Sequence, residues 1–398
     1  MSTSEESGYS PQIMTAGGQT IIGGLSRVFH CNFYNSYLQM AVLLTQASGD
    51  HNPKQLLTNS VTPLVNNLIN CGYTEQDLLE EFAFCGFGYL EQRDEKTWET
   101  PISHYGQRLC LHGRPQKSCY FTSGYLQGML NKVVTETACQ IETKEHDEFS
   151  VSDKTLQIKN YLCNEFQLTS NIPERFDFDT RVDEDVITAT VATLPLKGHY
   201  VANETALISA FGVVLTNHFA DYYNKISYET YFALMDAGIP KEDAEEIFTQ
   251  AGHICAFNTF GGIMKSPEWY GLVAPQCDSK EDWFHGMIAV VNALGWGVYR
   301  VEKIDPKGET IVRVYNSYEG VGYRRMYSQT DEKNMSFLVM GGMLGLVHLL
   351  WKVDIREKPE LTEDFYVNQF NNIANSYQVK QTHAIAAGDE YDRVVVFK

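Results

Sequence analysis

The sequence predicts an α+β protein built from two similar domains, and three observations lead to this prediction. The segments 70–88 (NCGYTEQDLLEEFAFCGFG) and 236–254 (DAGIPKEDAEEIFTQAGHI) resemble each other without a gap. The likeness resumes with altered spacing in two further pairs of blocks, 102–106 with 316–320 and 122–130 with 339–347. Any two amphipathic helices look alike, but three matching blocks in the same order favour an internal duplication.

Each copy is expected to run as two helices, a group of strands, a glycine-rich helix and a closing pair of strands, with the helices covering one antiparallel sheet. In 70–88 and 236–254 a Gly stands two residues before the Thr or Pro that starts the helix, and an acidic first turn complements the helix dipole. Copy two also carries an extra segment, 282–315, whose pattern predicts a helix, a Gly-Trp-Gly break and a hairpin. Copy one has almost nothing equivalent, so its sheet should be smaller.

Length and composition indicate how the chain is divided and in which environment it works. We expect a disordered polar tail at 1–22, copy one at 23–160, a linker at 161–196 and copy two at 197–398. The 398 residues are 43% hydrophobic, which suits a large core, and no apolar run is long enough to span a bilayer. The N-terminus lacks the features of a signal peptide, so a cytoplasmic protein that does not enter a membrane is expected.

Charge and cysteine content narrow the function classes. The net charge of −19 would repel a phosphate backbone, so direct binding of nucleic acid is not expected. Nine cysteines without the framework of a small secreted domain indicate reduced thiols and one metal site rather than disulfides.

The closing segments of the two copies, 118–151 (SCYFTSGYLQGMLNKVVTETACQIETKEHDEFSV) and 377–397 (YQVKQTHAIAAGDEYDRVVVF), carry a family resemblance. They are similar to the end of the 4-vinyl reductase domain, in which a Cys…SGY…G helix leads into a strand hairpin with the pattern E-x-x-C. The resemblance covers roughly 26–151 and 197–398. It implies a small-molecule-binding fold with helices packed on an antiparallel sheet.

The resemblance also implies a metal site in copy one. In phenol-sensing members of the family, the Cys, Glu, Cys and Cys of the pattern hold zinc, and Cys119, Glu136 and Cys139 match three of these positions. Asp147 stands where the last cysteine is expected, with His146 beside it, and both side chains are acceptable zinc ligands. The alternative is that the cysteines are small buried hydrophobic residues. In copy two, His383 and Asp392 do not complete a zinc site, although they could pair across the hairpin.

The family places its ligand cavity between the helices and the sheet, under the strand that carries 316–320 (NSYEG) and the helix that carries 250–254 (QAGHI). The ligand-binding candidates in the two copies are His104, Tyr105, His253, Tyr318 and Glu319. Aromatic walls with a few polar groups suit a small apolar or aromatic ligand. The alternative is that these side chains are satisfied core residues.

The stretch 29–39 (FHCNFYNSYLQ) is unusual in polar and aromatic content for the entry of an apolar helix. As a helix it would place His30, Phe33 and Tyr34 on adjoining faces, with Asn32 at the flank. Adjacent helical residues diverge by about 100°, so a nucleophilic pair of His30 and Cys31 is disfavoured. We expect a pocket-lining helix entry in which His30, Asn32 and Tyr34 contact the ligand.

These observations favour a binding protein or sensor for a small, largely apolar or aromatic ligand, with a structural zinc in copy one and a homodimer as a further expectation. The alternative is a reductase-like enzyme that uses a cavity of histidines and tyrosines with iron or haem. A protein-interaction module is a third hypothesis.

Overall fold

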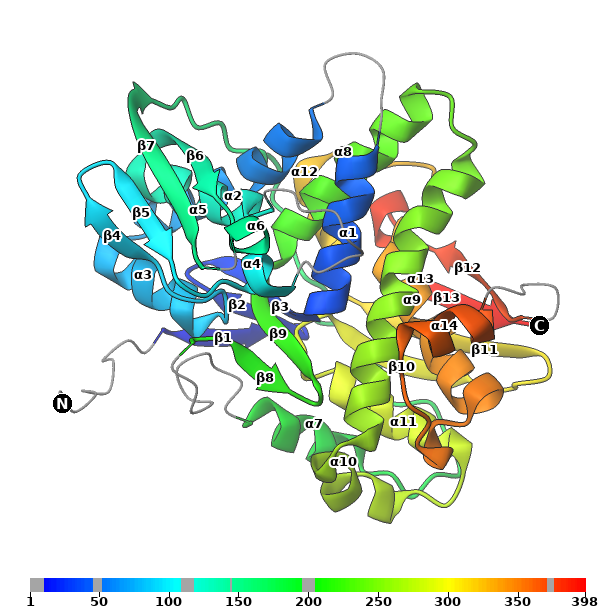
Figure 1. Cartoon of the computed structure of the whole chain (residues 1–398). Helices are drawn as coiled ribbons and strands as arrows, with labels where there is room; N and C mark the ends of the chain where they lie inside the picture. The colour runs from blue at the N-terminus through cyan, green and yellow to red at the C-terminus, as the bar shows by residue number, and fades with distance from the viewer. Residues whose placement is uncertain (1–10, 46–51, 109–117, 144, 195–204, 371–375) are drawn as a thin grey trace.

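The computed structural model describes residues 11–45, 52–108, 118–143, 145–194, 205–370 and 376–398. Its described part is a mixed α+β structure, as predicted, and it contains three antiparallel sheets (Figure 1). The first sheet has the strand order β1 (Ile13–Ala16), β2 (Gln19–Ile22), β3 (Leu25–Cys31), β9 (Val213–Phe219), β8 (Ile208–Ala210). The second has the order β4 (Glu91–Asp94), β5 (Thr97–Thr100), β7 (Asp147–Thr155), β6 (Lys132–Ala138). The third has the order β10 (Val298–Lys303), β11 (Glu309–Tyr315), β13 (Asp392–Phe397), β12 (Gln378–His383).

The helices of the first half are α1 (Asn32–Leu44), α2 (Pro53–Asn70), α3 (Glu75–Phe84), α4 (His104–Arg108), α5 (Tyr120–Leu130), α6 (Gln140–Thr143) and α7 (Glu184–Ala192). Those of the second half are α8 (Ala220–Asp236), α9 (Lys241–Lys265), α10 (Pro267–Leu272), α11 (Lys280–Val291), α12 (Tyr318–Met326), α13 (Phe337–Val347) and α14 (Glu363–Phe370). Short helical turns lie at Ala274–Gln276, His348–Val353, Ile355–Glu357 and Ile385–Ala387.

The second and third sheets share one strand order. In each sheet the first two strands in sequence form a hairpin, the fourth strand pairs with the second, and the third strand lies at the far edge. One of these sheets lies within 91–155 and the other within 298–397. The first sheet instead takes β1, β2 and β3 from one half of the chain and β8 and β9 from the other. Strand β3 pairs antiparallel with β9, with Arg27 opposite Phe219 and Cys31 opposite Leu215. The two halves are thus joined by main-chain hydrogen bonds.

Two of the predicted segments differ from the structure. Residues 13–22, expected in a disordered tail, form β1 and β2, because Gly17 and Gly18 take positive φ angles (54° and 82°) and close a tight hairpin between them. Residues 1–10 lie outside the described part. The predicted linker 161–196 contains α7, whose first turn is capped by the side chain of Asp183.

A third difference concerns NSYEG, which was expected to lie on a strand. Strand β11 ends at Tyr315, and the Ser317 hydroxyl accepts a hydrogen bond from Gly320 N (3.1 Å) to start α12. The same cap recurs at 102–106, where the Ser103 hydroxyl accepts from Gly106 N (2.8 Å) at the start of α4. A serine followed three residues later by glycine is therefore a helix start in both halves.

Close helix packing holds each half together. Helix α5 lies against α2, and α13 lies against α9, at distances that only glycine permits. A Cβ atom at Gly124 of α5 would meet Thr58 O at 2.0 Å, and one at Gly341 of α13 would meet Thr249 O at 2.0 Å. Within the described ranges, the helices fall short of the combination of length and apolar character that a membrane span requires.

Candidate metal centre and buried histidine cluster

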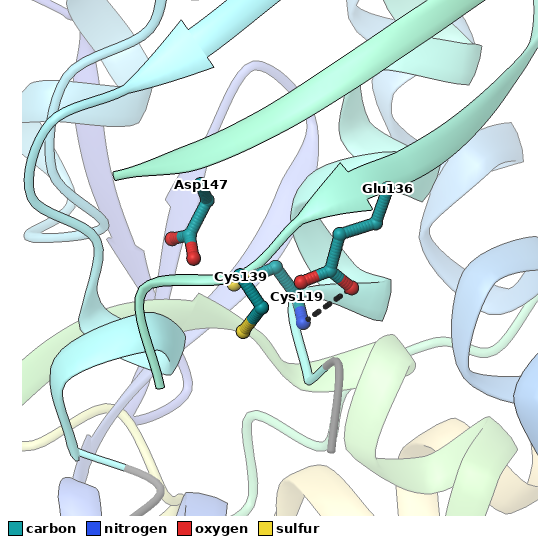
Figure 2. Close-up of side chains that lie close together, drawn as sticks. All are labelled: Cys119, Glu136, Cys139 and Asp147. Carbon is teal, nitrogen blue, oxygen red and sulfur yellow. Dashed lines mark hydrogen bonds between the residues drawn. The ribbon is translucent and has the colours of Figure 1, made fainter. Parts of the chain in front are cut away.

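Four acidic side chains predicted as metal ligands converge at the end of the β6–β7 hairpin (Figure 2). Cys119 precedes α5, Glu136 lies on β6, Cys139 follows β6, and Asp147 begins β7. One ligand atom of each lies within 4.8 Å of every other, and all four residues are buried. The structure therefore brings together the whole predicted set. His146, the alternative fourth ligand, is not a member of the group.

Local hydrogen bonds fix the orientation of these side chains. Cys119 N donates to Glu136 Oε2 (3.1 Å), which ties the start of α5 to β6. Asp147 accepts from Gln140 N and from the Ser103 hydroxyl, both at 2.6 Å. Ser103 is a residue that the sequence analysis did not single out, although it belongs to the matched block 102–106. Its hydroxyl both caps α4 and orients Asp147.

The electrostatics of the group favour a bound cation. Burial, followed by the neighbouring Cys139, raises the pKa of Glu136 to about 9. Burial also raises the pKa of Cys119. A hydrogen bond from Cys119 lowers the pKa of Cys139 to about 6. Four acidic groups cannot all ionise side by side in a buried site unless a positive charge offsets their repulsion. Thiolates and carboxylates are ligands that Zn²⁺ accepts in a tetrahedral site, so the residues fit this ion.

An open cleft of about 910 Å³ between α2, α5 and β6 borders the centre. Glu136 lines it together with Ser123 and Gln127 of α5. The cleft gives the group a route to solvent, which a site that loads metal after folding requires.

The third sheet has a hydrogen-bonded counterpart of this centre. Its hairpin is bulged between Gln381 and His383, as the β6–β7 hairpin is bulged between Glu136 and Ala138. Gln381 therefore takes the place of Glu136, and its Oε1 accepts from Ser336 N at 2.9 Å. Hydroxyl and amide groups replace thiols and a carboxylate there.

Asp392 fills the role of Asp147 in the counterpart. It accepts from Ile385 N (2.7 Å) and from the hydroxyl groups of Ser317 and Ser336 (2.8 Å for the latter). Gln381 Nε2 adds a further bond at 2.9 Å. The suggested pairing of His383 with Asp392 is wrong. His383 lies opposite Arg393 in the strand register, and its ring stacks on Tyr391 with 5.3 Å between the ring centroids.

Among the predicted ligand-binding residues, His30, Tyr34 and Tyr318 lie together in the interior. The His30 ring stacks on Tyr34 (centroids 4.2 Å apart) and on Trp296 (5.0 Å). Its Nε2 lies 3.3 Å from the Tyr318 hydroxyl. Burial lowers the pKa of His30, so its imidazole is neutral at physiological pH.

His104 and Tyr105 belong to the same buried region. Side chains of α1 and α8 connect His104 to the His30 ring. His104 Nε2 lies 2.9 Å from Asn35 Nδ2, and Asn35 Oδ1 accepts from the Tyr223 hydroxyl at 2.5 Å. The Tyr223 ring in turn lies edge-on to His30, with 4.9 Å between centroids. The Tyr105 hydroxyl lies 3.0 Å from His218 Nε2. Asn35, Tyr223 and His218 were not predicted; they become neighbours only through the packing of α1 against α8 and β9.

The other three candidates have other hydrogen-bond partners. Asn32 Oδ1 accepts from Val214 N (3.0 Å) and so supports the start of α1. His253 Nε2 lies 2.7 Å from His348 Nδ1, and its Nδ1 lies 2.7 Å from the Tyr366 hydroxyl, in a separate cluster. Glu319 accepts from Leu338 N (2.9 Å) and Val339 N (3.1 Å) at the start of α13.

The helix expected over 29–39 begins three residues later than its first residue. Phe29, His30 and Cys31 belong to β3, which has strands on both sides, and α1 begins at Asn32. The Cys31 thiol accepts from Tyr34 N at 3.5 Å and caps the helix. The expected helical stripe of His30 and Tyr34 is therefore wrong, although the two rings do meet across the strand–helix junction.

No family model and no curated protein matches the chain. Among solved structures, the phenol-responsive sensory domain of the transcription activator PoxR, with phenol, is similar at a TM-score of 0.32 and 12% sequence identity. The similarity covers 45% of this chain and 74% of that one.

Proposed function

We propose that this chain is a binding protein or sensor for a small, largely apolar or aromatic ligand, and that Cys119, Glu136, Cys139 and Asp147 hold a structural zinc ion in it. The convergence of these four buried ligands carries the proposal. The zinc would tie the start of α5 to the β6–β7 hairpin, because its ligands come from both. A site closed by four protein ligands stabilises a fold and leaves no position for catalysis.

The interior around His30 is the proposed ligand site. Aromatic rings of Tyr34, Trp296 and Tyr318 surround the imidazole, and such walls bind apolar rings by dispersion. The Tyr318 hydroxyl, 3.3 Å from His30 Nε2, is the polar group that can fix the orientation of such a ligand.

Metal analysis by mass spectrometry tests the zinc site on protein purified without an affinity tag. We expect about one zinc per chain, because four ligands complete one tetrahedral site. Cys119→Ser and Cys139→Ser should lose it, whereas Cys71→Ser, which changes an exposed thiol, should keep it. Iron or a haem absorption band that persists in Cys119→Ser would instead support the enzyme hypothesis.

Calorimetric titration with phenol, a small ring with one hydroxyl group, tests the ligand site. Tyr318→Phe should weaken binding by roughly tenfold, the usual cost of one lost hydrogen bond. Tyr125→Phe is the matched control, because Tyr125 is equally buried but donates to Leu78 O in another region. An equal effect of the two substitutions, or no heat with phenol and other small aromatic compounds, would overturn the proposed ligand site.

A further inference from the structure

Two buried thiols from different halves of the chain face each other beside His30. Cys31 ends β3, and Cys255 lies in the middle of α9, which runs alongside α1 (Figure 1). Their Sγ atoms are 3.9 Å apart, and both residues are 0% exposed. Neither thiol belongs to the proposed zinc site, and neither was assigned a role by the ligand proposal.

The surroundings of Cys31 favour its thiolate. Its Sγ stands at the N-terminus of α1 and accepts from Tyr34 N, a position at which the helix dipole stabilises negative charge. Burial alone would raise the pKa of Cys31, but hydrogen bonding with Cys255, Thr259 and the main chain lowers it to about 7.

The surroundings of Cys255 suit the second thiol of a pair. Burial raises the pKa of Cys255, which therefore keeps its proton beside the Cys31 sulfur. His30 Nδ1 lies 3.7 Å from Cys255 Sγ. The neutral imidazole can accept a hydrogen bond from that thiol and so orient it.

We propose that Cys31 and Cys255 form a redox-active dithiol that hydrogen peroxide converts to a disulfide. The Cys31 thiolate attacks one peroxide oxygen, the O–O bond breaks, and hydroxide leaves, which gives Cys31 sulfenic acid. The Cys255 sulfur then attacks the Cys31 sulfur, and its proton leaves with the sulfenic oxygen as water. The S–O bond breaks as the S–S bond forms. The two sulfurs together lose two electrons, and the peroxide, with the thiol proton and one proton from solvent, becomes two waters.

The geometry agrees with this chemistry. The two Sγ atoms must close from 3.9 Å to about 2.05 Å, which side-chain rotation at the end of a strand and on a helix can supply. Peroxide is small and uncharged, so it suits a pair of buried thiols better than larger or charged oxidants do. The disulfide would join β3 to α9 and would withdraw the thiol from His30, so the redox state would reach the proposed ligand site directly.

The test uses the full-length, zinc-loaded protein. The protein is treated with hydrogen peroxide, and catalase then removes the excess peroxide. It is denatured in the presence of N-ethylmaleimide, which blocks free thiols, and digested with trypsin. The tryptic peptides 28–54 and 242–265 each contain a single cysteine, Cys31 or Cys255. We expect mass spectrometry to find these two peptides linked, and reduction to separate them. Cys85 is the internal control: it is equally buried, but burial raises its pKa, so it should react at least about tenfold more slowly.

The variant Cys255→Ser gives an independent readout. It keeps the size of the side chain, and it should trap Cys31 as a sulfenic acid that dimedone labels. The proposal is overturned if Cys31 and Cys255 both remain free at a peroxide dose that oxidises the exposed Cys71, or if a link forms only between Cys119 and Cys139. A link between Cys119 and Cys139 would also show that zinc does not protect these two thiols. A chain that binds no zinc would leave the dithiol proposal intact.

Discussion

The side chain of Glu319 is a buried carboxyl group that accepts hydrogen bonds from two main-chain amides of α13. Burial raises its pKa from 4.5 to about 8 even though these amides favour the charged form. The folded protein therefore holds this proton more tightly than the unfolded chain does. The stabilising contribution is complete below the unfolded pKa and is lost as the pH rises through the folded pKa.

We expect the free energy of unfolding to fall between pH 5 and pH 8, with Glu319 contributing up to about 4 kcal/mol of that fall. Glu319→Gln should flatten this dependence, because an amide does not titrate. Urea denaturation at several pH values measures the slope. Glu242→Gln, at an exposed position of α9, should keep the wild-type slope. Parallel curves for wild type and Glu319→Gln would contradict the assignment.

Variants of Asp147 and Asp392 distinguish a carboxylate that binds metal from one that only supports the fold. Both accept from a main-chain amide and a serine hydroxyl at the same place in their hairpins, but only Asp147 stands beside thiols. Asp147→Asn should weaken zinc binding by at least roughly 10- to 100-fold in a competition with a chelator, because even the loss of a group that only orients a metal ligand has that effect. Asp392→Asn should leave zinc affinity unchanged. Equal zinc affinities in the two variants would remove Asp147 from the ligand set.

These residues show which parts of a site the sequence can predict. Glu136, Cys139 and Asp147 lie on one hairpin, so their short spacing in the sequence fixes their spacing in space. The cluster around His30 takes Tyr34 from α1, Tyr318 from α12 and further rings from elsewhere. Its members meet only after tertiary packing. No local pattern shows that Asn35 joins His104 to Tyr223.

At the scale of elements, the close contact between α13 and α9 depends on one of two adjacent glycines. A Cβ at Gly341 would meet Thr249 O at 2.0 Å and His253 N at 2.6 Å, whereas one at Gly342 meets nothing within 4 Å. Gly341→Ala should therefore lower the free energy of unfolding by about 1–3 kcal/mol through overpacking. Gly342→Ala should be neutral or slightly stabilising, because alanine favours helix. Urea denaturation of the pair measures the difference, and equal values would show that α13 can shift to accept the methyl group.

The elements were predicted best where the signals are local. The helix starts predicted at Thr74 and Pro240 are confirmed, because these residues are the N-caps of α3 and α9. The strand at 29–31 was missed because its main evidence is pairing with β9, almost two hundred residues away in sequence. NSYEG was misassigned because the strand before it ends at Tyr315, one residue before this motif begins.

At the scale of the whole molecule, β3 and β9 make one sheet out of two halves that the sequence presents as separate copies. Arg27 on β3 pairs with Glu81 and lies 3.6 Å from the ring centroid of Phe219 on β9. Removing either half would leave a strand edge of this sheet unpaired, and removing the second half would also uncover Arg27. The repeat predicted two domains, but repeated local patterns carry no information about pairing between the copies.

The shared sheet predicts that the halves fold together. Chains 1–196 and 197–398, cut at the predicted boundary and expressed separately, should lack a cooperative thermal transition in near-ultraviolet circular dichroism, because each loses its partner across β3–β9. Co-expression should restore the transition, since the strand pairing and the buried cluster around His30 can then form between chains. The intact chain with a protease site at this boundary is the control, and after cleavage it should unfold as the uncut protein does. A sharp transition in either fragment alone would mean that its four-stranded sheet and helices form a sufficient core, and that the central sheet adds only an interface between two independent domains.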